Sequence, residues 1–345
     1  METFLPLTWF FIVGLTLLLF VILDGADLGI GVLSLGAGEA RRATLLNAIG
    51  PLWYANETWL VIAGAIMFGA FPQAYSIIFS AMYIPAMMLI FGLMFRAVSI
   101  EFLDQSQNKR LWGYCLGAGS LLAILGQGFL LGGLLTNVSV ANGSFAGGPW
   151  DWLSPMSILI AVGTLAGHIM LGASFLVNKV RENAPAGNWR ILQASSWIAY
   201  GFFVLAVILM PVVRTPVSEM WVRQLLRTVI SGGQQYIYIM PVLLLVAIFA
   251  FVMVFIGSAR RTNAKAPYVW SIVLFLSVIS AIVAAIFPFL IPFSVTISSA
   301  ASSTTSLTFM LYGAGAVLPI VIIYNLYVRK VFGGKVSGEE KQSRY

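Results

Sequence analysis

Four ionisable side chains lie inside long apolar stretches of this sequence, where charge is costly: Asp24, Asp27, Glu57 and His168. A charged group near the centre of a membrane helix costs about 2.5 to 3.5 kcal/mol on insertion scales, so such residues are rare without a function. Carboxyl groups in this setting suit proton transfer or cation binding. These residues are therefore the first candidates for chemistry.

Three of the four residues are acids whose spacing brings them together. Asp24 and Asp27 share a helix face, while Gly25 and Gly29 form a small-residue pair that lets another helix approach closely. A basic loop joins the first two apolar segments, which places Glu57 at a depth similar to that of the aspartates. We expect the three carboxyls to lie in one layer that faces protein rather than lipid.

Two interpretations of this layer remain open. Burial and mutual repulsion both disfavour charge, so three neighbouring carboxyls need a cation, an arginine or bound protons. The functional interpretation is a proton-entry or cation site that faces the cytoplasm. The structural interpretation is that the acids cap broken backbone or pair with Arg96 or Arg41.

Four further residues belong with this layer by their positions. Asn56 precedes Glu57 and joins the candidate proton or cation site, and Trp53 shares its helix face as either a supporting group or an interfacial anchor. Arg96 ends the third apolar segment, and Glu101 follows at the boundary. Either these two residues form a charge pair there, or Arg96 extends to the interface by itself.

The sequence provides too few ligands for a redox centre of its own. His168 is the only histidine, so two imidazoles cannot hold one haem, and the methionines of apolar helices are usually packing residues. The single cysteine, Cys115, excludes a disulfide within the chain, and no metal-binding spacing or phosphate loop is present. We expect no catalytic residue and no metal or cofactor ligated by this chain, with His168 as a helix-helix hydrogen-bonding group.

The elements that must position these residues are membrane helices. Of the 345 residues, 60% are hydrophobic and only 9% are charged, a balance typical of a bilayer protein rather than of a water-soluble globule. Apolar segments recur along the whole chain, so residues 1–345 are expected to form a single integral membrane domain. The nine predicted spans of this all-α polytopic fold lie near 8–35, 51–71, 74–96, 111–135, 154–177, 193–213, 236–257, 267–290 and 308–328.

The distribution of basic residues predicts the orientation of these spans. All Lys and Arg residues except Arg214, Arg223 and Arg227 fall on one side, which is the pattern of the cytoplasmic face. The N-terminus is then outside and the C-terminus is in the cytoplasm. The net charge of +7 comes from residues at the ends of apolar runs rather than from a patch, so we expect no nucleic acid partner.

Two motifs around the acids carry a family resemblance. They are the segments 24–31 (DGADLGIG) and 50–60 (GPLWYANETWL), followed by the pairs 95–96 (FR) and 101–102 (EF). Weaker matches, such as Phe287-Pro288, extend the likeness over nearly the whole chain. The sequence resembles subunit II of the cytochrome bd-type ubiquinol oxidases, including the cyanide-insensitive branch.

This resemblance implies a fold, a partner and a reaction. The family fold has nine helices, arranged as two four-helix bundles plus one additional helix, in the prokaryotic cytoplasmic (inner) membrane. The implied partner is subunit I, which carries two haems b, one haem d and the quinol-oxidation site, in a complex that reduces dioxygen to water. Subunit II is then haem-free, supports subunit I and contributes to proton uptake from the cytoplasm. A small accessory single-helix subunit, membrane lipid and quinone are further partners that the resemblance leaves open.

The sequence departs from the family pattern in places, and two rival interpretations remain. Tyr54 stands where some members carry an acid on the proton route, and no acid lies near Ser299. Clustered acids among many helices also suit a proton-coupled secondary transporter, although acids near the cytoplasmic boundary rather than the midplane favour the oxidase. The other rival is a structural assembly factor without a proton path.

Overall fold

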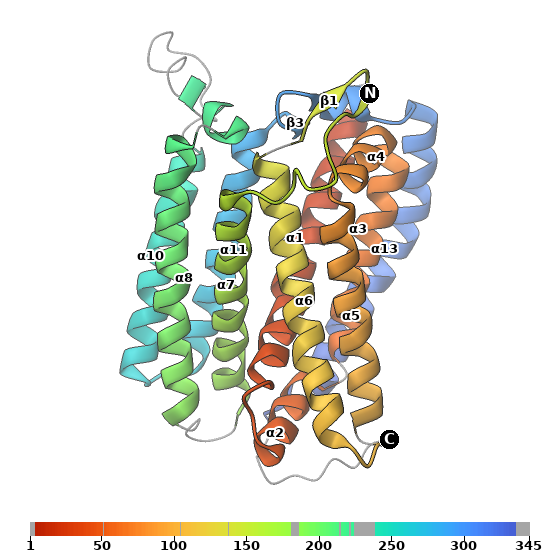
Figure 1. Cartoon of the computed structure of the whole chain (residues 1–345). Helices are drawn as coiled ribbons and strands as arrows, with labels where there is room; N and C mark the ends of the chain where they lie inside the picture. The colour runs from red at the N-terminus through yellow and green to blue at the C-terminus, as the bar shows by residue number, and fades with distance from the viewer. Residues whose placement is uncertain are drawn as a thin grey trace.

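The computed structural model describes residues 4–50, 52–103, 105–136, 138–180, 186–213, 215–220, 222–223 and 239–335. Within these ranges most residues are helical, and the long helices run side by side along the height of the molecule (Figure 1). The long helices are α1 (Phe4–Leu33), α3 (Leu52–Ala70), α5 (Tyr83–Leu103), α6 (Lys109–Thr136), α7 (Pro155–Lys179), α8 (Ala186–Val212), α10 (Ile239–Arg260), α11 (Lys265–Ile286) and α13 (Thr304–Phe332).

Short elements lie at the two ends of the long helices. Two antiparallel strand pairs lie at the end where α1 begins, and α2 lies at the opposite end (Figure 1). Val140 pairs with Phe145 in the first sheet, and Phe289 pairs with Thr296 in the second. The short elements are α2 (Glu39–Ile49), α4 (Pro72–Ala81), β1 (Val140–Ala141), β2 (Ser144–Phe145), β3 (Phe289–Ile291), β4 (Val295–Thr296) and α12 (Ile297–Ala300).

The number of possible membrane spans agrees with the sequence, but one predicted boundary does not. Among the described residues, eight single helices are long and apolar enough to cross a membrane, and α3 with α4 makes a ninth candidate if this bent pair is one span. The predicted continuous span at 74–96 is instead divided between α4 and α5. Pro72 begins α4 after a 120° bend, because the residue before a proline is disfavoured in the helical conformation.

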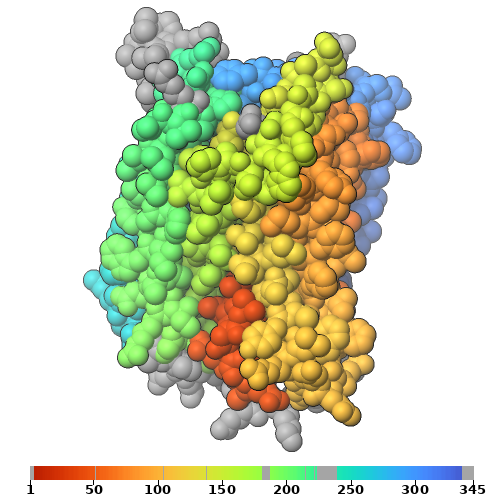
Figure 2. Space-filling view, in the orientation of Figure 1, coloured from red at the N-terminus to blue at the C-terminus, as the bar shows by residue number. Residues whose placement is uncertain are grey.

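Helix α2 is an element that the sequence prediction treated only as a basic loop. It is too short to span a membrane, and it has no long apolar run. Its Leu45 and Ile49 are nevertheless buried in the core of the helix bundle, and Gly50 ends it with a φ of 53°, which favours glycine. In Figure 2, α2 reaches the surface at the lower end of the molecule, beside α6. The helix therefore closes this end of the bundle.

Helix α1 lies at the centre of the packing and contacts α3, α6 and α7. Its approach to α7 is close because glycines face each other: a Cβ on Gly29 would collide with the backbone carbonyl of His168, and one on Gly172 would lie 2.7 Å from the nitrogen of Ile30. A Cβ on Gly25 would likewise lie 2.7 Å from the His168 ring. The close helix approach predicted from Gly25 and Gly29 is confirmed, and the partner is α7.

The basic residues that the structure describes gather toward one end of the bundle. Most lie at the ends of helices on the side of α2, such as Lys109, Arg260 and Lys265, whereas Arg223 lies beside Phe293 at the opposite end. This asymmetry matches the one on which the predicted orientation rests. Five residues used in that prediction lie outside the described ranges, namely Arg181, Arg214, Arg227, Lys341 and Arg344.

Candidate functional site

The candidate site is a layer of charged side chains between α1, α3 and α5, with Arg96 at its centre. Arg96 Nη1 lies 2.7 Å from Asp24 Oδ1, and Arg96 Nη2 lies 3.4 Å from Glu57 Oε2. The side chains of Arg96 and Asp24 are 0% exposed, whereas that of Glu57 is 25% exposed. The predicted common layer of Asp24 and Glu57 is confirmed, because one guanidinium contacts both acids.

Arg96 is therefore not the isolated interfacial arginine that one interpretation expected. A buried guanidinium needs compensating charge, and Asp24 and Glu57 supply it. Of the two cations considered as partners of the acids, only Arg96 takes that role among the described residues, because Arg41 instead lies 3.5 Å from the Asn188 side-chain oxygen. One oxygen of the buried pair is free, since Asp24 Oδ2 has no hydrogen-bond partner among the described residues.

Asp27 belongs to a second set of contacts, which passes through Asn56. The Asn56 amide donates to Asp27 Oδ2 at 2.7 Å and also lies 3.3 Å from the Leu23 carbonyl. The side-chain oxygen of Asn56 accepts a hydrogen bond of 2.8 Å from Arg329 of α13. The sequence prediction counted Arg329 only as a marker of topology, because nothing local in the sequence links it to a residue on α3.

Aromatic side chains cover the exposed side of the layer. The Trp53 ring stacks on Tyr54 at 3.7 Å between centroids, and the Arg96 guanidinium lies 5.8 Å from the Trp53 ring. The Tyr54 hydroxyl donates to Glu101 Oε1 at 2.6 Å. The pair of Arg96 with Glu101, one of the two alternatives, is not formed, because Arg96 bonds to buried Asp24 and Glu101 instead accepts from Tyr54.

Lys179 and His168, both on α7, lie near these contacts in different roles. Lys179 Nζ donates to the carbonyl of Phe332 at 2.7 Å and so holds the end of α13. His168 Nδ1 donates to the Thr164 carbonyl at 2.8 Å within its own helix, and Nε2 has no hydrogen-bond partner among the described residues. The expected hydrogen bond from His168 to another helix is therefore not present in the part of the chain that is described.

The acids of the layer lie close to cations of the same chain. Arg96 compensates Asp24 and Glu57, while Arg329 reaches Asp27 through Asn56. Within the described ranges, no group of three His, Cys, Asp or Glu side chains is placed to hold a metal ion. The partly exposed carboxyl of Glu57 and the buried carboxyl of Asp24 are two groups that can bind a proton, and the Arg96 guanidinium contacts both.

Comparison with known proteins identifies the family. The model of a family described as cytochrome bd terminal oxidase subunit II matches residues 5–332. The chain belongs to the cytochrome bd terminal oxidase subunit II family.

Named relatives of this cytochrome bd subunit II chain include two bacterial proteins. It is 29% identical over 178 residues to the cytochrome bd-I ubiquinol oxidase subunit 2 of Escherichia coli K12, a match that covers 49% of this chain and 47% of that protein. It is 36% identical over 135 residues to the cytochrome bd ubiquinol oxidase subunit 2 of Bacillus subtilis 168, covering 38% and 39% of the two chains. The chain thus spans about half the length, or less, of these two relatives.

A solved structure supports the fold of this subunit II family member. The chain is similar to one chain in the structure of bd oxidase from Geobacillus thermodenitrificans, with a TM-score of 0.77 and 15% sequence identity. The likeness covers 96% of this chain and 100% of the other chain. The arrangement of membrane helices is therefore shared over nearly the whole described length.

Proposed function

We propose that this chain is the haem-free subunit II of a cytochrome bd-type quinol oxidase, which oxidises quinol and reduces dioxygen to water. In this proposal two haems b and one haem d belong to a partner, subunit I, and the complex lies in the prokaryotic cytoplasmic membrane with the α2 end of this chain in the cytoplasm. The observation that carries the proposal is the buried Asp24-Arg96-Glu57 contact in a member of the subunit II family. In this proposal the helices form the two four-helix bundles of the family, with one additional helix.

The charged layer gives this subunit its part in proton uptake. Glu57 is the more exposed acid, so it receives protons first, and Asp24 is the buried acid with a free oxygen. Arg96 contacts both carboxyls and keeps them close, so that a proton on Glu57 and a proton on Asp24 are alternative states of one site. The Asp27-Asn56 contact extends the polar layer. Each of these groups holds a proton or donates a hydrogen bond, and none transfers an electron.

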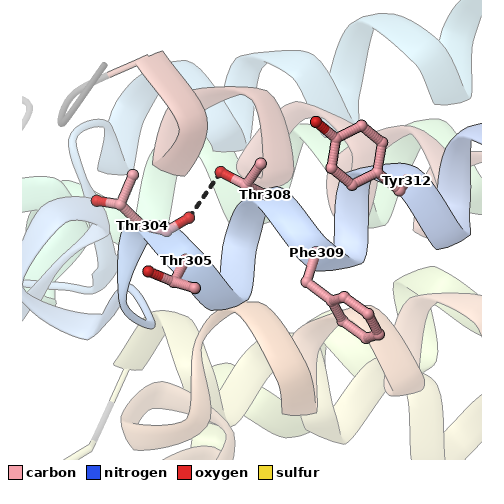
Figure 3. A pocket seen from close by; sticks show the side chains of 5 residues that line it. All are labelled: Thr304, Thr305, Thr308, Phe309 and Tyr312. Atoms are coloured by element: carbon pink, nitrogen blue, oxygen red, sulfur yellow. Dashed lines mark hydrogen bonds between the residues drawn. The ribbon is translucent and has the colours of Figure 1, made fainter.

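Helix α13 supports the existence of a protein partner. Only three of its side chains are buried, namely Leu307, Asn325 and Val328. Phe309 is 79% exposed and Tyr312 is 76% exposed, and together with Thr304, Thr305 and Thr308 they line a shallow cavity of about 400 Å³ (Figure 3). Polar side chains on a membrane helix are disfavoured against lipid and favoured against another helix. A partner subunit that covers this face satisfies that requirement, and lipid, quinone or a small single-helix subunit are further contacts that we propose for the complex.

Purification of the chain from membranes tests the proposal. We expect a tagged chain to copurify with a haem protein whose spectrum shows haem b and haem d, and the complex to consume oxygen when given quinol. A secondary transporter would instead purify without haem and move a solute unaided in vesicles. Such a result would refute the proposed function.

A further inference from the structure

Arg329 on α13 bonds to Asn56, which lies beside Asp27 in the charged layer. It lies in the last turn of α13, and its Nη2 donates to Asn56 Oδ1 at 2.8 Å, across a sequence separation of 273 residues. The amide of the same Asn56 donates to Asp27 Oδ2 at 2.7 Å. Asn56 therefore stands between a cation on α13 and an acid on α1.

This arrangement determines which way the Asn56 side chain points. A guanidinium has only donors, and an ionised carboxylate has only acceptors, so the amide oxygen must face Arg329 and the amide nitrogen must face Asp27. Without Arg329 the amide oxygen loses its partner, and the orientation of Asn56 then depends only on the contacts of its nitrogen with Asp27 and with the Leu23 carbonyl. Hydrogen bonds with a charged partner are also stronger than neutral ones, so the Arg329 contact holds this orientation firmly.

We propose that Arg329 is a positioning residue that fixes Asn56 against Asp27 and so sets the hydrogen bonding of the proton route. The inference rests on the proposed function, since it assigns Arg329 a part in proton uptake through Asp27. Arg329 contacts neither haem nor quinol in this proposal. It also bonds to the Tyr268 side chain, and its effect on the proton route is assigned to the Asn56 contact. The last turn of α13 thereby becomes part of the charged layer, although most of that helix lies on the outside of the bundle.

A competing explanation is that Arg329 only attaches α13 to the bundle. The chain offers a matched control for this, because Asn325, one turn earlier on the same face, accepts a hydrogen bond of 3.3 Å from Trp59 Nε1 on α3. Asn325→Leu removes an attachment between the same two helices and leaves Asn56 in place. Lys330→Gln removes a positive charge from the exposed side of the same turn.

The test measures quinol-driven oxygen consumption per haem in the purified complex. We expect Arg329→Gln to lower turnover about tenfold, which is the factor that one hydrogen bond to a charged group represents. Arg329→Lys keeps the charge and a donor, so it should recover most of this loss, and Asn325→Leu and Lys330→Gln should stay close to wild type. Equal losses in Arg329→Gln and Asn325→Leu would overturn the proposal, because the role would then be attachment of α13.

Double variants show whether Arg329 acts through Asn56. In an Asn56→Leu background, Arg329→Gln should cause almost no further loss, whereas independent effects would multiply and would contradict the inference. If Arg329→Gln lowers the yield of the complex, Asn56→Leu serves as a second variant, because it removes the same hydrogen bond from the α3 side. Asp27→Asn and Glu57→Gln separate this inference from the proposed function. Unchanged turnover in both would refute the proton route itself, while slow turnover in Asp27→Asn with normal turnover in Arg329→Gln would overturn only the role of Arg329.

Discussion

Arg96 on α5 and Asp24 on α1 form an ion pair of 2.7 Å in which neither side chain is exposed. The pair joins two helices at the level where Glu57 also reaches the same guanidinium. Such a pair is costly to bury and more costly to break, because removal of one partner leaves the other charge alone in a medium of low dielectric. Several expected outcomes depend on this layer and on the helix contacts around it.

Loss of Arg96 should destabilise the protein strongly. Arg96→Leu leaves Asp24 buried without its partner, so we expect a loss of about 3–5 kcal/mol in the free energy of unfolding. The double variant Arg96→Leu with Asp24→Asn removes both charges and should recover part of this loss. Thermal unfolding of the purified complex measures both effects, and equal stability of the single variant and the wild type would show that the pair contributes nothing.

Loss of the acids should slow oxygen reduction while the haems still assemble. Proton transfer by a positioned group typically contributes about 100-fold or more to a rate, so Glu57→Gln and Asp27→Asn should each lower turnover by about 100-fold. Glu39→Gln on the exposed side of α2 is the matched control and should retain wild-type turnover. Oxygen consumption per haem is the measurement. Normal turnover in both variants would remove the proton-uptake role, and loss of haem would indicate a structural role instead.

The approach of α1 to α7 should tolerate no side chain at Gly29. A Cβ at this position collides with the backbone of His168, which cannot move without displacing α7, so Gly29→Ala should destabilise the protein by about 1–3 kcal/mol. Gly14→Ala on the same helix is the control, because a Cβ there meets no atom within 4 Å in the described structure. Helix propensity alone favours alanine at both positions. A neutral effect of Gly29→Ala on complex yield and thermal stability would contradict this packing.

His168 should be dispensable for haem binding. Its Nδ1 is bonded to Thr164, and its ring lies against Gly25 and the edge of Phe275, with 5.4 Å between the ring centroids. His168→Leu should therefore leave the haem spectrum of the complex unchanged. Disappearance of one haem signal in this variant would show that the chain contributes a haem ligand after all, and the haem-free assignment would be wrong.

The sequence was sufficient to locate the acids, the close helix contact and the apolar spans, because these depend on local composition and on spacing along one helix. Asp24, Asp27 and Glu57 were recognisable as charges within apolar runs, and Gly25 and Gly29 as a small-residue pair. These features require no knowledge of which helices are neighbours.

The features that were missed depend on contacts between distant segments. Arg329 meets Asn56 across 273 residues, and no spacing rule connects a residue near the end of one helix with a residue on another. A pair of Arg96 with Glu101 was one of two alternatives because the residues are near in sequence, but five residues correspond to about 140° around a helix, so Arg96 is buried while Glu101 is exposed. The boundary between α4 and α5 was missed because the apolar run continues through it, so hydropathy alone could not reveal the break.

The attachment of Arg329 to Asn56 also has a consequence for biogenesis. Asp27 and Asn56 leave the ribosome long before Arg329, so α1 and α3 must enter the bilayer while one of their counter-charges has not yet been synthesised. A nascent chain that stops before Arg329 would present an incompletely neutralised membrane segment, which is a feature that quality-control proteases can recognise.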